Sequence, residues 1–247
     1  MARWLASFSE LVGLIVLKES KQQIWRRIRR ELSRSGLLRF CDVVAFRLYY
    51  SVAISRRDQR WEARELDKLC RVYPPLPPDI PIFYSHSPNT SAAKQFIQNL
   101  HPDIMIARCK TLLKENIFSQ SSKGTLVMHP GICPEYRNAH GCFWALANDD
   151  LERVGMTLLR IDRGVDTGPV YGYFTYDFDE VAESHIVIQN RVVFDNLNQI
   201  QGRICEIYSG DVRQLDTSNR PSAIWGQPRL TSYLRWKHRA KKRQAGS

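Results

Sequence analysis

A histidine and an aspartate that follow two different predicted strands are the side chains best placed for chemistry. His129 directly follows the buried-strand pattern TLVM, and Pro130 disfavours a helix there, so this histidine stands at a strand end on a loop. Asp166 lies between Gly164 and Gly168, and glycines allow a sharp bend and a close approach of a ligand. A carboxylate beside an imidazole orients the ring and favours its protonated form, which can donate to an oxygen that gains negative charge. Such a pair suits acyl transfer; a structural histidine and an Asp-Thr-Gly turn are the alternative.

Three stretches around these residues, HPGICPEYRN, HGCFWALAND and VGMTLLRIDRGVDTGPVY, follow one another from residue 129 to residue 171. Together they resemble the signature of the folate-dependent formyltransferase family, which includes methionyl-tRNA, phosphoribosylglycinamide and sugar formyltransferases. The resemblance is strong over residues 103–172. It implies an α/β, Rossmann-like formyltransferase fold and transfer of a formyl group from 10-formyltetrahydrofolate to a primary amine.

The resemblance also implies roles for individual residues. His129 would stabilise the formyl oxygen while the amine attacks, and Asp166 would keep His129 protonated and help to move the proton that the amine releases. The segment ARCKTLL resembles the loop that binds the pteridine ring, so the expected folate contacts are Lys110, Leu112, Leu113 and Val165. The expected substrate contacts are Tyr136, Arg137, Asn138 and His140. No metal is implied.

The chain departs from the family pattern in three places. The catalytic asparagine of the family would stand two positions before His129, where this chain has Val127, and the loss of one such donor costs about 100- to 1,000-fold in rate. The glycine after Tyr-Arg is replaced by Asn138, which tolerates a left-handed backbone. The first strand of the fold is missing or remodelled. A second hypothesis is therefore a catalytically impaired formyltransferase-like binding domain.

The identity of the formyl acceptor is narrowed by chain length. A methionyl-tRNA acceptor fits the basic ends, but that branch of the family normally carries an additional C-terminal barrel, and about forty residues follow the last predicted helix here. We therefore favour a small-molecule or sugar-nucleotide amine.

Two residues of the motif have competing interpretations. Cys133 is interpreted as a packing thiol and not as a nucleophile, since no motif supports the latter. Arg137 could bind a phosphate or carboxylate of the substrate, or pin its loop to Asp149 or Asp150. Both possibilities stay open.

The nearby aromatic and histidine residues are weighed in the same way. His140 could shape the mouth of the substrate site or make a local hydrogen bond at a helix start. His185 is expected to be a partly exposed helix residue, and Trp144 a core residue with Phe143 and Leu146.

Composition is that of one globular domain. The 247 residues are 43% hydrophobic, and a chain of this length buries roughly 70 to 75% of its unfolded surface, so disorder is excluded as the main state. The apolar run Trp4–Leu17 is interrupted by Glu10 and is too short to span a bilayer. Six cysteines without a C-x-x-C pair predict reduced, mostly buried thiols in a cytoplasmic protein.

The net charge of +11 is concentrated in two segments. Eight cations and no carboxylate side chain lie between Arg220 and the end, and seven cations against two carboxylates lie in Lys18–Arg34. Such segments attract phosphates of nucleic acid, lipid or a nucleotide-linked substrate. A solvated, frayed terminus is the equally weighted alternative for the C-terminal segment.

Periodicity predicts alternating strands and helices, which is typical of an α/β protein with a mostly parallel sheet. The strands are expected at residues 11–17 (buried on both faces), 82–83, 101–109, 125–128, 155–162 and 170–176. The helices are expected within 18–53 (one or two), after 89–91, at 139–148 and at 182–208, with an extended proline-rich connector at 73–83. We divide the chain into a divergent N-terminal part (1–79), a catalytic core (80–216) and a basic tail (217–247).

Overall fold

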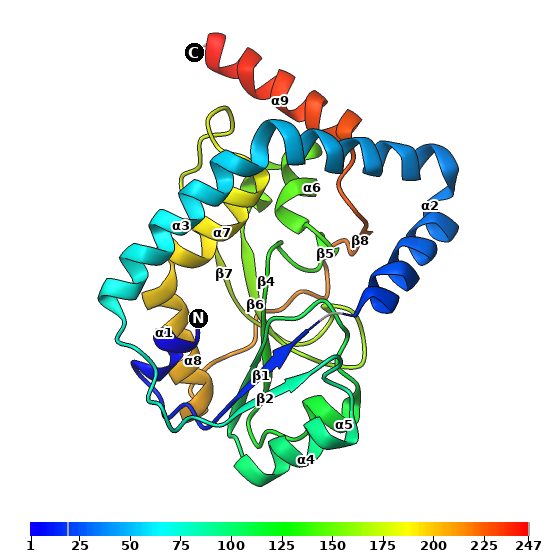
Figure 1. Cartoon of the computed structure of the whole chain (residues 1–247). Coiled ribbons are helices and arrows are strands. Elements are labelled where there is room, and N and C mark those ends of the chain that lie inside the picture. The colour runs from blue at the N-terminus through cyan, green and yellow to red at the C-terminus, as the bar shows by residue number, and fades with distance from the viewer. Residues whose placement is uncertain (19, 247) are drawn as a thin grey trace.

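Strands and helices alternate along the chain in the computed structural model, which describes residues 1–18 and 20–246 (Figure 1). The strands are β1 (Leu14–Leu17), β2 (Ile82–Ser85), β3 (Ile104–Ala107), β4 (Gly124–His129), β5 (Arg137–Asn138), β6 (Met156–Arg160), β7 (Val170–Phe174) and β8 (Ile224–Trp225). The α-helices are α1 (Ala2–Ala6), α2 (Lys21–Tyr49), α3 (Ser55–Val72), α4 (Ser91–Leu100), α5 (Glu115–Phe118), α6 (Gly141–Ala147), α7 (His185–Asp195), α8 (Leu197–Ser209) and α9 (Leu230–Ala245). A π-helix (Tyr50–Ile54) joins α2 to α3, and a 3-10 turn (Leu151–Arg153) follows α6.

The sheet that carries the functional residues has the strand order β3-β4-β6-β7. β3 and β4 are parallel, whereas β6 runs antiparallel to both β4 and β7. Two small parallel pairs, β1-β2 and β5-β8, complete the strands of the described residues. The predicted α/β class is confirmed, and parallel pairing is the more frequent kind.

The first strand differs from its prediction. β1 begins at Leu14 and pairs only with β2 among the described residues, and Val16 is 37% exposed. The expectation of a strand buried on both faces is therefore wrong. An apolar run predicts burial only where neighbouring elements cover it, and one edge of β1 faces a cavity instead.

The helices between β1 and β2 follow local signals. Ser20 and Gln23 form a capping box, in which Gln23 N donates to Ser20 Oγ at 3.2 Å and Ser20 N donates to Gln23 Oε1 at 2.9 Å. Gly36 interrupts α2 with a φ of 73°, which favours glycine, so the predicted helical segment contains a break. The proline-rich connector follows α3 without helix, as predicted.

The helix predicted for residues 182–208 is two helices. Asn196 separates α7 from α8, and its side-chain amide donates to the carbonyls of Val192 (2.8 Å) and Thr175 (3.0 Å). These bonds compete with a continuous helix, which explains the break.

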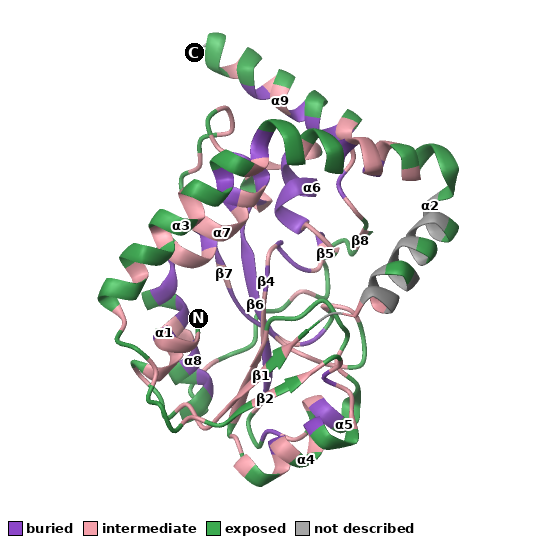
Figure 2. Ribbon diagram, in the orientation of Figure 1, coloured by how far each residue is buried: buried purple, intermediate pink, exposed green. Residues whose placement is uncertain are grey.

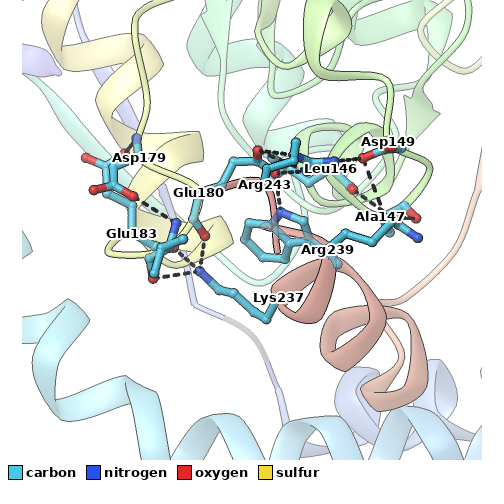
Figure 3. A network of polar contacts seen from close by, with 11 residues as sticks. Leu146, Ala147, Asp149, Asp179, Glu180, Glu183, Lys237, Arg239 and Arg243 are labelled. Carbon is cyan, nitrogen blue, oxygen red and sulfur yellow. Dashed lines mark hydrogen bonds and ion pairs between the residues drawn. The ribbon is translucent and has the colours of Figure 1, made fainter. Parts of the chain in front are cut away.

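The basic C-terminal segment ends in a packed helix, so its interpretation as a frayed, solvated terminus is wrong. α9 packs against α2 and α6 and buries Tyr233, Trp236 and Ala240. Lys237 Nζ donates to the carbonyls of Glu180 (2.6 Å), Val181 (3.3 Å) and Glu183 (2.5 Å). Figure 3 shows Lys237 beside Glu180 and Glu183. The domain boundaries at residues 79 and 216 stay an interpretation.

Two clusters make up most of the core, and the outer faces of α3, α9 and the C-terminal half of α2 are exposed (Figure 2). One lies under α6 and α9 and contains Phe143, Trp144 and Leu146, as predicted. The other joins the central sheet to α8. All six cysteines are free thiols, but only Cys133 and Cys142 are buried, so the expectation of mostly buried thiols is wrong. Among the described residues, no helix combines the length and hydropathy that crossing a bilayer requires.

Candidate active site

The side chains of His129 and Asp166 meet at the end of β4. His129 is the last residue of the strand and is 4% exposed. Its Nδ1 lies 3.3 Å from Asp166 Oδ2, which is within ion-pair distance when the ring is protonated. The structure therefore brings together the two residues that the sequence singled out.

A tight turn holds Asp166 against the histidine. Asp166 has a left-handed φ of 51°, and its Oδ2 accepts a hydrogen bond from the backbone N of Asn138 at 2.8 Å. Gly168 is packed so closely that a Cβ would lie 1.9 Å from the carbonyl oxygen of Arg160. The side chain of Asp162 accepts from Gly164 N (2.9 Å) and closes the turn. Gly168 is thus required by close contact with the backbone, whereas a Cβ on Gly164 would meet the side chain of Thr167.

The second nitrogen of His129 contacts the loop that follows it. Nε2 lies 2.8 Å from the carbonyl oxygen of Tyr136, and a carbonyl oxygen only accepts hydrogen bonds. Both ring nitrogens therefore face acceptors. This arrangement suits an imidazole that carries a proton on each nitrogen.

Thr157 supports the loop from β6 and was not singled out from the sequence. It stands opposite His129 in the β4-β6 register and is fully buried. Its hydroxyl donates to Gly131 O (2.7 Å) and accepts from Cys133 N (2.9 Å). The sequence did contain a signal for this role, since Thr157 stands inside the apolar run MTLL. A hydroxyl in a buried strand needs a hydrogen-bond partner, which predicts a contact with a neighbouring loop.

The residues predicted to contact substrate mostly make contacts within the protein, around the loop that follows His129. Tyr136 is buried, and its hydroxyl donates to Asp150 at 2.9 Å. The guanidinium of Arg137 donates to the carbonyl of Val165 at 3.0 Å, and its buried Nε has no partner among the described residues. The interpretation that Arg137 pins its loop to Asp149 or Asp150 is wrong.

Those two aspartates pair with other arginines. Arg153 contacts Asp150 at 3.0 Å, and Arg243 contacts Asp149 at 2.5 Å. Asn138 turns its side-chain amide to the carbonyl of Trp225 at 2.5 Å. Its amide therefore does not replace the family's missing asparagine.

His140 begins α6 in a left-handed conformation, and its side chain makes no capping bond. The interpretation of a local hydrogen bond at the helix start is therefore wrong. Nδ1 is buried without a partner among the described residues. Burial, together with the nearby charges of Arg47 and Lys110, lowers the pKa of His140 to about 4.

His185 is 2% exposed, so the expectation of a partly exposed helix residue is wrong. Its ring is surrounded by the rings of Phe46 (centroids 5.4 Å apart) and Phe143 (5.3 Å). Burial lowers its pKa well below the ordinary value. The thiol of Cys133 is buried as predicted, and burial raises its pKa to about 12.

A cavity of about 1010 Å³ opens beside the expected folate loop. Ala107 pairs with Val127, so the loop that follows β3 starts at the same sheet edge as His129. Lys110 and Leu113 line the cavity. Leu112, which is 67% exposed, and Val165 do not line it.

Fold and site together define an α/β protein with a histidine–aspartate pair at the end of a central strand. The sequence model described as formyl transferase matches residues 62–199, more than half of the chain. The chain belongs to the formyl transferase family.

Among the curated proteins, it is 35% identical over 92 residues to the methionyl-tRNA formyltransferase of Kosmotoga olearia, covering 37% of this chain and 29% of that protein. The corresponding enzyme of Thermotoga neapolitana is 30% identical over 129 residues, covering 49% of this chain and 41% of that protein.

Solved structures show the same fold. A sugar N-formyltransferase from Shewanella sp. superposes with a TM-score of 0.50 at 12% identity, covering 88% of this chain and 77% of that chain. The formyltransferase PseJ from Anoxybacillus kamchatkensis, solved with tetrahydrofolate and a UDP-linked formamido sugar, gives a TM-score of 0.50 at 14% identity, covering 74% and 92%. The curated relatives above are matched over less than half of their length.

Proposed function

We propose that the protein transfers a formyl group from 10-formyltetrahydrofolate to a primary amine of a small molecule or sugar nucleotide. The observation that carries this proposal is the contact of His129 Nδ1 with Asp166 Oδ2, 3.3 Å apart at the carboxyl end of β4. Family membership supports the transferase class, and the folate and sugar ligand of a structural neighbour supports the choice of donor and acceptor.

The cavity residues fit a folate. At the end of the cavity beyond β3, Leu113 offers an apolar side chain to a flat ring, and Arg108 and Lys110 supply cations for an anionic tail. Lys110 and Leu113 would hold this cofactor, which supplies a formyl group already activated for transfer.

The protein's own groups would then stabilise charge and move a proton. His129 would donate from Nε2 to the formyl oxygen in place of the Tyr136 carbonyl, its present partner. Asp166 would hold the second proton on Nδ1 and take part in removing the proton that the acceptor nitrogen loses. The backbone N of Asn138 would keep the carboxylate oriented.

The second candidate function is a formyltransferase-like binding domain with impaired catalysis. Val127 shares the His129 face of β4, since side chains alternate along a strand. It packs against Cys133, Leu159 and Val170, and offers no hydrogen-bond donor. This observation favours slow chemistry with ligand binding retained.

One experiment separates the two functions. The protein is incubated with 10-formyltetrahydrofolate and a panel of UDP- and dTDP-linked amino sugars, and the products are analysed by mass spectrometry. A formylated sugar that depends on Asp166 supports the transferase. Saturable binding of folinic acid by calorimetry without any formylated product supports the binding domain.

A further inference from the structure

Both β1 and β3 have one edge without a partner strand among the described residues. β1 pairs with β2 alone, and β3 pairs with β4 alone. Each free edge presents backbone N–H and C=O groups that can pair with another strand. Both edges belong to parallel pairs, a kind of sheet that is normally covered and internal.

The two free edges open on the same cavity. All four residues of β3 line it, and so do Leu14, Ile15 and Leu17 of β1. Successive side chains of a strand point to opposite faces, so a cavity that reaches consecutive residues lies at the strand's edge and not over one face. The cavity is therefore a gap between two sheet edges.

Helices wall this gap with apolar side chains. α4 contributes Phe96, Ile97 and Leu100, and α8 contributes Ile204 and Tyr208. An apolar wall disfavours water as the permanent partner of the strand edges, because buried backbone groups need hydrogen bonds. The gap is therefore lined by strand edges whose backbone groups have no partner strand, and by apolar side chains of the two helices.

We propose that this cavity accepts an extended, apolar polypeptide strand that hydrogen-bonds to β1 along one edge and to β3 along the other. Such a strand would join the β1-β2 pair to the central sheet. β1 and β3 are four residues long, so the strand would span about four to six residues, or about 13 to 20 Å. Its residues would be β-branched or small and would exclude proline, which cannot donate to a ladder.

The slot, defined here as the part of the cavity between β1 and β3, does not include the folate loop. Lys110 and Leu113 lie beyond the end of β3 at Ala107, at the carboxyl edge. A strand in the slot and a folate at the loop would therefore be compatible. This inference does not rest on the proposed formyl transfer.

The test uses a short valine and isoleucine peptide with lysines at both ends for solubility. It is added to the full chain and, in a second arm, fused upstream of Met1 through a glycine linker, which raises its effective concentration. Amide hydrogen exchange is measured on residues 14–17 and 104–107. We expect both strands to be protected by about tenfold or more, because new ladder bonds form on both edges.

The matched control is the same peptide with a central proline, which should protect neither strand. A chain variant, Cys205→Trp, places a bulky ring into the slot from an exposed position of α8 that lines the cavity. We expect it to weaken peptide binding by about tenfold or more at an unchanged melting temperature. The Asp166→Asn variant should bind the peptide like the unaltered chain, which separates this inference from the proposed activity.

Three results would overturn the inference. Equal protection by the proline peptide would show non-specific binding. Displacement of the peptide by folinic acid would assign the slot to the cofactor. A dimer in sedimentation, with both edges already protected in the chain alone, would assign the slot to a second copy.

Discussion

Gly131 and Gly141 are in close contact beside His129, and a Cβ on Gly141 would stand 2.4 Å from Gly131 Cα. The same Cβ would stand 2.8 Å from the carbonyl oxygen of Tyr136, which is the partner of His129 Nε2. The position of this loop over His129 therefore depends on the absence of two side chains.

Gly141→Ala should destabilise the fold by about 1–3 kcal/mol, because backbone must move to admit the methyl group. Formyl transfer should be lost as the Tyr136 carbonyl shifts. Gly202→Ala on α8 is the control: a Cβ there meets nothing within 4 Å, and alanine should stabilise a helix by about 0.5–1 kcal/mol. Urea unfolding measures both, and equal midpoints for Gly141→Ala and the unaltered chain would refute the prediction.

His129→Ala and Asp166→Asn should each reduce turnover by about 100- to 10,000-fold, the range of general acid–base contributions. The two side chains interact directly, so the double variant should be little worse than either single one. Circular dichroism and folinic acid binding should stay unchanged. Unaltered turnover in either single variant would show that the family roles do not apply to this chain.

Val127→Asn should raise turnover by about 100-fold, since it restores an amide donor on the His129 face of β4. Val127→Asp is the matched control, because it has the same shape without N–H groups. An equal gain in both variants, measured as initial rate, would point to a change in packing against Cys133 and Leu159 instead.

Acid should destabilise the protein through His140 and His185, whose pKa values are lowered in the folded state. The pKa of His140 is lowered to about 4 and that of His185 is also lowered well below its ordinary value, so the folded state binds fewer protons than the unfolded chain below about pH 6.5. Stability is therefore intact above that value and falls as the pH falls, by on the order of 3 kcal/mol for His140 near pH 4. Urea midpoints between about pH 7 and pH 4.5 measure how steeply stability depends on pH.

His185→Phe should make stability less dependent on pH, whereas His238→Gln at an exposed position of α9 should leave the pH dependence unchanged.

Lys237→Met should cost about 2–3 kcal/mol, because one ammonium group satisfies three backbone carbonyls ahead of α7. Lys237 Nζ also lies 4.3 Å from the centroid of the Trp236 ring, and methionine loses this cation–π contact as well. Lys241→Met, at an exposed position of the same helix, should leave the unfolding midpoint within error of the unaltered chain. If both variants unfold alike, the network in Figure 3 does not hold α9 in place.

The sequence determined the local features of this protein. Apolar runs located β3, β4, β6 and β7, the polar residues 89–91 marked the start of α4, where Thr90 is the N-cap, and glycine and proline marked the turns that carry His129 and Asp166. These signals are short-range, since strand periodicity, capping and turn chemistry depend on a few neighbouring residues. The family motif identified the residue pair whose contact the structure shows.

Burial was decided by tertiary structure alone. His185 and α9 are packed by residues far away in the sequence, and buried Asp58 accepts a hydrogen bond from Ser184, 126 positions later. The unpaired edges of β1 and β3 likewise follow from which strands lie side by side. No local pattern encodes such contacts, because burial and edge pairing depend on surfaces that distant segments bring together only when the chain folds.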